Sequence, residues 1–184
     1  FTKKAAKEMQ DRAVAMESRS SGAMIRTFHS FGAWFLRKFY QEAGVDQSFT
    51  VYDDDDMVTL LNKAVPSLNK QQASAVAHNI ALAKDYCLTP DDPDLSQISA
   101  KSEFREAYKA YETRLRQTGN VDFGDLIMLP ALLLENNENI RRQMHYRFKV
   151  IMVDEYQDSN VAQFKLLRAL VGDVTAGDPT YVCV

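Results

Sequence analysis

The chain has 184 residues, of which 46% are hydrophobic and 26% are charged, and its formal net charge at pH 7 is −3. This composition is typical of a folded globular chain and excludes a disordered one. No apolar run approaches the roughly 20 residues that a membrane-spanning helix needs, and no signal-peptide pattern opens the chain, so we expect a cytoplasmic protein without a membrane partner. The small negative charge argues against nucleic-acid binding through bulk electrostatics alone, so any such contact must come from local placement of side chains.

The cysteines and the ends of the chain add two expectations. Cys87 and Cys183 have no CxxC or Cys/His spacing, so neither a disulfide framework nor a zinc site is indicated, and both are interpreted as buried thiols. The chain opens on Phe1 inside a helical pattern, and it stops in the apolar run 181–184, which is typical of an unfinished strand. We therefore expect a fragment excised from a longer protein.

The first third of the chain predicts the order helix, strand, helix. Thr2 is a suitable N-cap for a helix that the cluster 18–22 ends, and residues 23–27 are typical of a short strand. Ser30 then precedes a helix that Gly44 stops. This second helix carries an aromatic stripe that is interpreted as packing, at Phe31, Trp34, Phe35 and Phe39.

The middle of the chain, from about residue 44 to 118, predicts helices and no strands. The acidic run 53–56 is interpreted as a helix start, because it lacks the spaced ligands and the glycine of a calcium loop. Further helices are expected over 71–87 and 103–117, with an exposed loop at 89–94 between them. The second of these helices has an apolar stripe that we expect to be buried, at Phe104, Tyr108, Tyr111 and Leu115.

Strand character returns in the last third. After a turn at Gly119 the segment 122–125 opens an apolar helix, which Pro130 should bend or restart. The short β-branched run 148–153 predicts a buried parallel strand. Ser159 can cap the helix that follows and Gly172 ends it. The residues expected on the buried face of that helix are Val161, Phe164, Leu167 and Leu170.

Two adjacent acids, Asp154 and Glu155, end this predicted strand. The carboxyl ends of parallel strands are where α/β sheets bind ligands. One acid can hold Mg²⁺ while its neighbour orients an attacking water, which suits nucleotide hydrolysis. A hydrophobic strand followed by two solvated acids is a common arrangement, however, so residues 150–155 alone leave a purely structural interpretation open.

The residues that follow, Tyr156-Gln157-Asp158-Ser159-Asn160, make the segment resemble the second motif of the superfamily 1 DNA helicases, the UvrD, Rep and PcrA group. Three other segments match in the same order along the chain. Residues 1–9 are similar to the TFTNKAAxEM segment of that family, residues 27–31 to TFHSF, and residues 122–126 to DFDDLL. The chain thus resembles an internal piece of an ATP-driven DNA motor.

This resemblance implies a fold and a division into domains. The fold class is α/β, a partial RecA-like P-loop NTPase domain with a parallel sheet, interrupted by an all-helical insertion domain. Residues 1–43 and 119–184 would form the ATPase domain, called 1A, and residues 44–118 the insertion domain, called 1B, which helps to engage duplex DNA. Movement from 3′ to 5′ along DNA is likewise implied by the family and by no residue seen here.

The resemblance also implies roles for individual residues. Asp154 would bind the magnesium ion that accompanies ATP, Glu155 would activate the hydrolytic water, and Gln157 would sense the nucleotide. The segments that would contact single-stranded DNA contain Phe1, Thr2, Lys3, Thr27, Phe28 and His29. Expected partners are single-stranded DNA, junctions of single and double strands, and DNA repair or replication proteins.

Some residues depart from the family pattern or remain open. Lys3 stands where the family usually has Asn, which could exchange a directed hydrogen bond for an ion pair with phosphate. Gly124 stands where a second acid is frequent, and no role beyond permitting a tight turn is assigned to it. His29 could cap or pack instead of binding DNA. His78 and His145 are interpreted as surface residues.

No GxxxxGK[ST] phosphate loop occurs in the 184 residues. In the family that loop would lie upstream of Phe1, and a GDDDQ-type motif would follow Val184. We therefore expect the fragment alone to bind ATP and Mg²⁺ weakly and to be inactive. Two alternatives stay open: part of a helicase subunit fused to a nuclease, and a DNA-binding or protein-docking module that does not use an ATPase.

Overall fold

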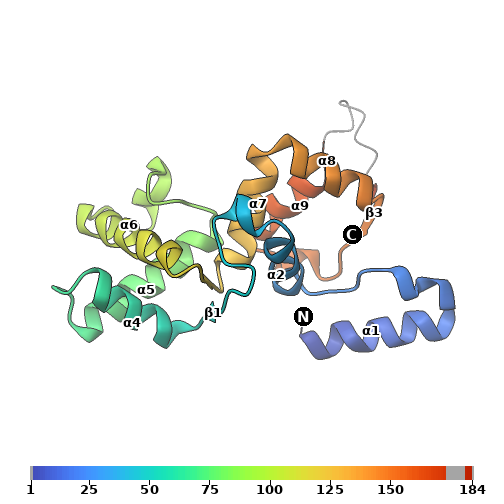
Figure 1. Cartoon of the computed structure of the whole chain (residues 1–184), viewed down its shortest axis with the longest axis horizontal. Helices are drawn as coiled ribbons and strands as arrows, with labels where there is room; N and C mark the ends of the chain where they lie inside the picture. The colour runs from blue at the N-terminus through green and yellow to red at the C-terminus, as the bar shows by residue number, and fades with distance from the viewer. Residues whose placement is uncertain (1, 173–180, 184) are drawn as a thin grey trace.

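The computed structural model describes residues 2–172 in full and the backbone of residues 181–183. Within these residues the protein is mostly helical and contains two small sheets, each of two parallel strands. Helices α4, α5 and α6 gather on one side of the molecule, and α2, α7, α8 and α9 on the other (Figure 1). The α/β prediction is therefore confirmed only in this coarse form.

The N-terminal segment folds as α1 (Lys3–Met16), a 3-10 turn (Ser18–Gly22), α2 (Phe28–Lys38) and α3 (Tyr40–Ala43). Thr2 caps α1 as predicted, because its hydroxyl accepts a hydrogen bond from the Ala5 N–H at 3.2 Å. Ala6 is the buried residue of this helix, whereas Met16, at its end, is 90% exposed.

Two predictions for this region are wrong. Residues 23–27 do not form a strand, because a strand needs a neighbouring ladder and none of the described strands pairs with them. The N-cap of α2 is Thr27 and not Ser30: the Thr27 hydroxyl accepts from the Ser30 N–H at 3.1 Å. The helix therefore begins three residues earlier than expected, which puts Phe28 and His29 in its first turn.

The middle of the chain contains α4 (Asp54–Ala64), α5 (Lys70–Asp85), a 3-10 turn (Pro93–Gln97) and α6 (Ser102–Gln117). The acidic run begins α4 as predicted, with Asp53 and Asp56 forming a reciprocal capping box. A strand was not expected here, yet β1 (Val51–Tyr52) pairs in parallel with β2 (Val121–Asp122). This short ladder joins the start of the helical segment to the chain that leaves it.

The last third contains α7 (Asp125–Asn136), α8 (Glu138–Arg147), β3 (Val150–Met152), a 3-10 turn (Tyr156–Asp158), α9 (Val161–Val171) and β4 (Tyr181–Cys183). Helix α8 was missed, and α7 runs through Pro130 without restarting. Strand β3 is parallel to β4, as predicted, but it is not buried: Val150 is 60% exposed and Met152 is 79% exposed.

Helix α9 also departs from expectation at its start. Its N-cap is Asn160 and not Ser159, because the Asn160 side chain accepts from the Gln163 N–H at 2.9 Å. Gly172 ends it as predicted. The buried residues of α9 are Ala162, Leu166, Leu167 and Leu170, whereas Val161 and Phe164 are about two-fifths exposed.

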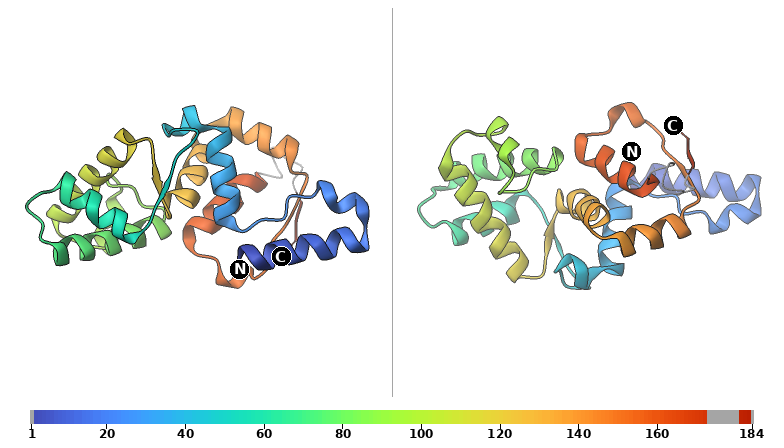
Figure 2. Two further views of the ribbon diagram at one scale, coloured as in Figure 1. Left: turned by 60° about the horizontal axis from the view of Figure 1, so that its bottom comes forward. Right: turned by 90° about the horizontal axis from the view of Figure 1, so that it is seen from above.

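The buried side chains form two apolar clusters. The first, which we call the α7 core, joins α2, α7, α8 and α9 and includes Phe35, Leu134 and Leu166. The second, the α6 core, joins α4, α5 and α6, and contains the predicted stripe of α6 with Tyr108 and Tyr111 fully buried. Figure 2 shows the two groups of helices side by side, with α7 between α2 and α5.

Helices α2 and α7 cross at very short range. A Cβ atom on Gly32 of α2 would lie 1.6 Å from the backbone oxygen of Leu126, so only glycine fits. Pro130 has no N–H to donate to that same oxygen, which lies four residues earlier in α7. The proline and the glycine are therefore matched: one leaves a carbonyl group without its helical hydrogen bond, and the other lets the neighbouring backbone cover it.

We predict that Gly32→Ala destabilises the fold by about 3 kcal/mol or more, because the added methyl group would overlap a backbone carbonyl and would push α2 away from α7. Urea denaturation measures the change. Gly22→Ala is the control, since a Cβ at Gly22 meets no atom within 4 Å, and its effect is expected to stay within about 0.5 kcal/mol. Equal stabilities of the two variants would contradict the close crossing.

Candidate functional site

Asp154 and Glu155 follow the carboxyl end of β3, and both side chains are exposed. Asp154 accepts a hydrogen bond from the Glu155 N–H at 3.0 Å. Glu155 has φ of +52°, a left-handed conformation that non-glycine residues rarely adopt. It turns the chain sharply from β3 into the 3-10 turn, where the Gln157 amide donates to the Glu155 carboxylate. The three predicted nucleotide-site residues are thus within one short turn.

The segment after this turn is tied to the helical middle. The Asn160 side-chain amide donates to Asp85 at the end of α5, at 2.9 Å. The same side chain caps α9, as described above, so its position is fixed from two sides. Burial raises the pKa of Asp85. No hydrogen bond or ion pair among the described residues joins Thr2 or Thr27 to Asp154 or Glu155.

The predicted DNA-contact residues are distributed over the two N-terminal helices. Thr2 and Lys3 are exposed at the start of α1, and Phe1 lies outside the described residues. Thr27 is occupied in capping α2, and Phe28 packs against the α7 core. The cap and this packing therefore fix the position of the first turn of α2.

His29, in that first turn, stacks on an aromatic ring that the sequence analysis did not single out. Its ring centroid lies 3.8 Å from that of Phe123, with an angle of 17° between the planes. Burial lowers the pKa of His29, so the imidazole is neutral at pH 7. Phe123, in contrast, is 58% exposed, and the pair presents an aromatic surface to solvent.

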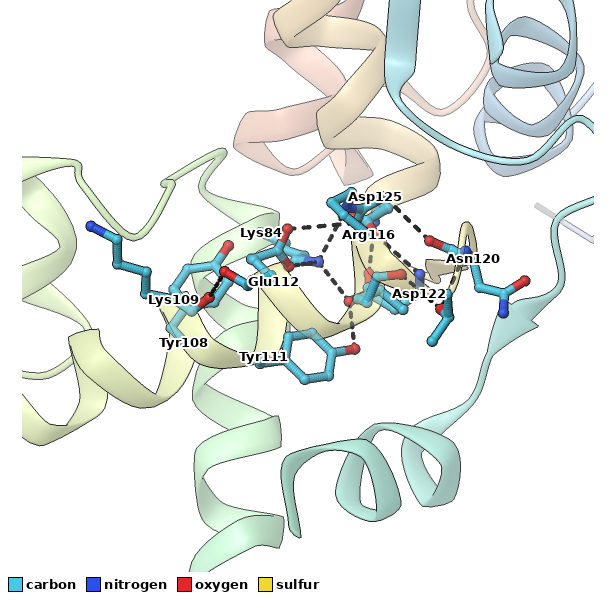
Figure 3. A network of polar contacts seen from close by, with 12 residues as sticks. Lys84, Tyr108, Lys109, Tyr111, Glu112, Arg116, Asn120, Asp122 and Asp125 are labelled. Atoms are coloured by element: carbon cyan, nitrogen blue, oxygen red, sulfur yellow. Dashed lines mark hydrogen bonds and ion pairs between the residues drawn. The ribbon is translucent and has the colours of Figure 1, made fainter. Parts of the chain in front are cut away.

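Asp122 and Asp125, on either side of Phe123 and Gly124 in the sequence, belong to a buried ionic cluster (Figure 3). Lys84, near the end of α5, is 1% exposed, and its ammonium nitrogen lies 2.6 Å from Glu112, 2.6 Å from Asp122 and 2.7 Å from Asp125. The spacing of these three carboxylates would also suit a metal ion. Here the ammonium group of Lys84 supplies the positive charge among them.

Two further side chains complete the cluster. Arg116 forms ion pairs with Asp125 and, at 3.5 Å, with Glu112. The Tyr111 hydroxyl donates to Asp122 at 2.9 Å. The cluster therefore joins α5 and α6 of the helical middle to β2 and the start of α7.

The electrostatics of the cluster follow from its burial and its charges. Burial by itself lowers the pKa of Lys84, but Asp122, Asp125 and Glu112 together raise it well above its ordinary value. Burial also opposes ionisation of Asp125, yet Lys84 and Arg116 hold the pKa of that carboxyl below its usual range. Burial raises the pKa of Glu112. Lys84 is thus a permanent cation at any ordinary pH.

Asp122 and Asp125 also hold each other. The Asp125 N–H donates to the Asp122 carboxylate at 2.9 Å, and the Asp122 N–H donates to the Asp125 carboxylate at 3.2 Å. Phe123 and Gly124 are the two residues between them. A Cβ on Gly124 would lie 2.8 Å from Cβ of Lys84. Gly124 therefore does more than permit a turn, because it admits the Lys84 side chain to the cluster.

The remaining predictions for single residues have mixed outcomes. His145 is 4% exposed and lies 3.2 Å from the Ala169 carbonyl oxygen, so its interpretation as a surface residue is wrong. It lies on the inner side of α8, a helix that was not predicted. His78 is exposed and Cys87 is buried, as expected. The Cys183 side chain lies outside the described part of the structure.

With these motifs and this geometry established, the chain can be assigned to a class. It matches the UvrD/REP helicase N-terminal domain over residues 1–182 and belongs to that family. Across the described residues, every helix is too short or too polar to traverse a bilayer.

Several known proteins are similar over nearly the whole chain. ATP-dependent DNA helicase Rep of Escherichia coli is 34% identical over 94% of this chain, and DNA helicase II of the same organism is 30% identical over 94%. ATP-dependent DNA helicase PcrA of Leuconostoc citreum is 32% identical over 92%. These alignments cover 26%, 25% and 24% of the relatives, so the chain spans about a quarter of their length.

We predict that Lys84→Met destabilises the protein by about 3 to 5 kcal/mol, because the carboxylates of Asp122 and Asp125 would stay buried without their shared cation. Chemical denaturation measures the loss. Lys109→Met is the control: Lys109 also pairs with an aspartate, Asp91, but this ion pair is exposed, and its removal should cost less than about 1 kcal/mol. Similar losses of stability in both variants would show that the buried position of the Lys84 cluster does not increase its contribution to stability.

Proposed function

We propose that this chain is part of an ATP-dependent DNA helicase or translocase that couples ATP hydrolysis to 3′-to-5′ movement on single-stranded DNA and to duplex unwinding. Family membership supports this, as do the activities named for Rep, PcrA and DNA helicase II. The observation that supports it most directly is the pair Asp154 and Glu155, which are exposed one residue beyond the carboxyl end of a parallel strand. DNA and, in the cytoplasm, repair or replication proteins would be its partners.

The proposed domains are a RecA-like domain 1A, residues 1–43 and 119–184, and a helical insertion domain 1B, residues 44–118. The two apolar cores support this division, since the α6 core contains residues of the insertion alone and the α7 core draws mainly on the flanking segments. Val45, Phe49 and Cys87 of the insertion nevertheless pack in the α7 core. The boundary is therefore a packed one, with no flexible linker implied.

The residues after β3 fit a magnesium nucleotide. Carboxylate oxygen is the ligand that Mg²⁺ prefers, and Asp154 offers it at an exposed position. The metal, when bound with ATP, would neutralise charge on the phosphates. Glu155 would accept a proton from the attacking water, and its contact with Gln157 would hold its carboxylate in place. The left-handed backbone at Glu155 fits a functional role, because such conformations cluster at active sites.

The His29 and Phe123 rings fit a single-stranded nucleic acid. An exposed aromatic face can stack on an unpaired base of any identity, which suits a motor that moves along many sequences. Phe123 offers such a face, and neutral His29 supports it from behind. We propose that Phe1, Thr2, Lys3, Thr27 and Phe28 belong to the same DNA-binding surface, with hydroxyl groups and Lys3 meeting phosphates.

Phe123→Ala is expected to weaken binding of a fluorescent single-stranded oligonucleotide by about fivefold or more, since one stacked base contributes about 1 to 3 kcal/mol. Fluorescence anisotropy at low salt measures this, and binding should weaken further as salt rises. Tyr146→Ala is the matched control, because Tyr146 is also an exposed aromatic residue, 82% exposed, and lies on α8. Equal affinities of wild type and Phe123→Ala would exclude the stacking role.

Measurement of ATP turnover tests the proposed role in ATP hydrolysis. The 184 residues contain no phosphate loop, so we expect no DNA-stimulated ATPase from them alone. In the parent protein, Glu155→Gln should lower kcat by about a hundredfold or more, with DNA binding retained. A parent that binds DNA without hydrolysing ATP would instead favour the ATPase-independent module. A separate acidic metal site beyond this chain, with nuclease activity, would identify a helicase-nuclease subunit.

A further inference from the structure

The ring of Phe123 lacks the support that normally fixes an aromatic side chain. It belongs to neither apolar core, and its ring contact in the described structure is the stack on His29. More than half of its surface is exposed. The direction of this side chain must therefore be set by its backbone, which is the two-residue tip between Asp122 and Asp125.

Lys84 contacts both residues that flank this tip. The two aspartates on either side of Phe123 and Gly124 accept hydrogen bonds from each other's N–H groups, and the second oxygen of each carboxylate lies 2.6 to 2.7 Å from the Lys84 nitrogen. The aliphatic stem of Lys84 lies under Gly124, where it leaves no space for a Cβ. The Lys84 side chain thus contacts three of the four residues 122–125.

Lys84 belongs to the helical segment, far from this tip in the sequence. It lies 38 residues before Asp122 and 41 residues before Asp125, at the end of α5. The carboxylates of Asp122 and Asp125 are fully buried, and the side chain of their neighbour Glu112 is 20% exposed, so water cannot replace the ammonium group without a large cost in free energy. Loss of this one cation would release the tip from α5.

We propose that Lys84 is a positioning residue for DNA binding: by clamping Asp122 and Asp125 it holds the ring of Phe123 against His29, in the orientation that stacks on a base. This inference rests on the proposed function for its consequence in DNA binding. The helical segment would then contribute to the binding of single-stranded DNA through Lys84, although Lys84 itself would not contact the DNA.

The test uses a charge-balanced pair of substitutions, Lys84→Met with Asp122→Asn. Methionine keeps the aliphatic bulk under Gly124, and asparagine can still accept the hydrogen bond from the Asp125 N–H. One cation and one anion are removed together, and Arg116 remains to pair with Asp125. The protein should therefore fold, and only the tie between α5 and the tip is lost.

The first readout is the NMR signal of the His29 ring protons. In the wild type the Phe123 ring, 3.8 Å away and nearly parallel, should shift these signals upfield, and Phe123→Ala should remove the shift. We expect the charge-balanced pair to lose most of it. Ile80→Ala is the control, since Ile80 is fully buried on α5 one turn before Lys84. This variant weakens the same helix and should keep the shift.

The second readout is binding of a labelled single-stranded oligonucleotide. The charge-balanced pair should lose about as much affinity as Phe123→Ala, about fivefold or more, and the triple variant should lose no more than either. Retention of the His29 shift in the charge-balanced pair, or multiplied losses in the triple variant, would overturn the inference. If the wild type binds no single-stranded DNA, the proposed function fails, while the NMR result still decides whether Lys84 positions Phe123.

Discussion

A single buried ammonium group connects the two halves of this protein. Moving the charge of Lys84 out of water is costly unless anions surround it at close range, and Glu112, Asp122 and Asp125 do so from two different parts of the chain. The three carboxylates in turn would repel one another without it. None of these charges can therefore leave the cluster alone, and α5, α6 and the start of α7 are held in one arrangement.

The end of α5 contacts both proposed binding segments. Lys84 holds the tip that carries Phe123, and the next residue, Asp85, accepts a hydrogen bond from Asn160, which caps α9 just after the acidic segment. Lys84 and Asp85 are consecutive residues, so both contacts start from the same turn of α5. Coupling between two sites can be carried by packed elements of this kind.

The sequence was sufficient where structure depends on near neighbours. The capping role of Thr2, the helix start in the acidic run before Met57 and the buried stripe of α6 all follow from residues within one or two turns. The errors arose where burial depends on distant segments. The apolar run at β3 was expected to be covered on both faces, yet among the described strands it pairs only with β4 and Met152 stays exposed.

The same limit explains the candidate site. Glu155 and Gln157 could be found in sequence because they lie side by side in a recognisable motif, and His29 because it lies in another. Phe123 was part of a matched segment, but only the stack on His29 marks it as a binding residue. Lys84 carried no local signal at all, since a lysine near a helix end ordinarily reaches into solvent. Its role depends on partners 38 and 41 residues away.

Gly124 shows how a departure from a family pattern can be structural. An acid is frequent at this position in the similar segment of the family, and its absence could be taken for loss of a functional group. In this protein a side chain at Gly124 would meet Cβ of Lys84 at 2.8 Å, and a carboxylate there would bring a fourth negative charge to a cluster that has two cations. Glycine at 124 and lysine at 84 are therefore mutually dependent, because the missing side chain is what lets the buried cation reach Asp122 and Asp125.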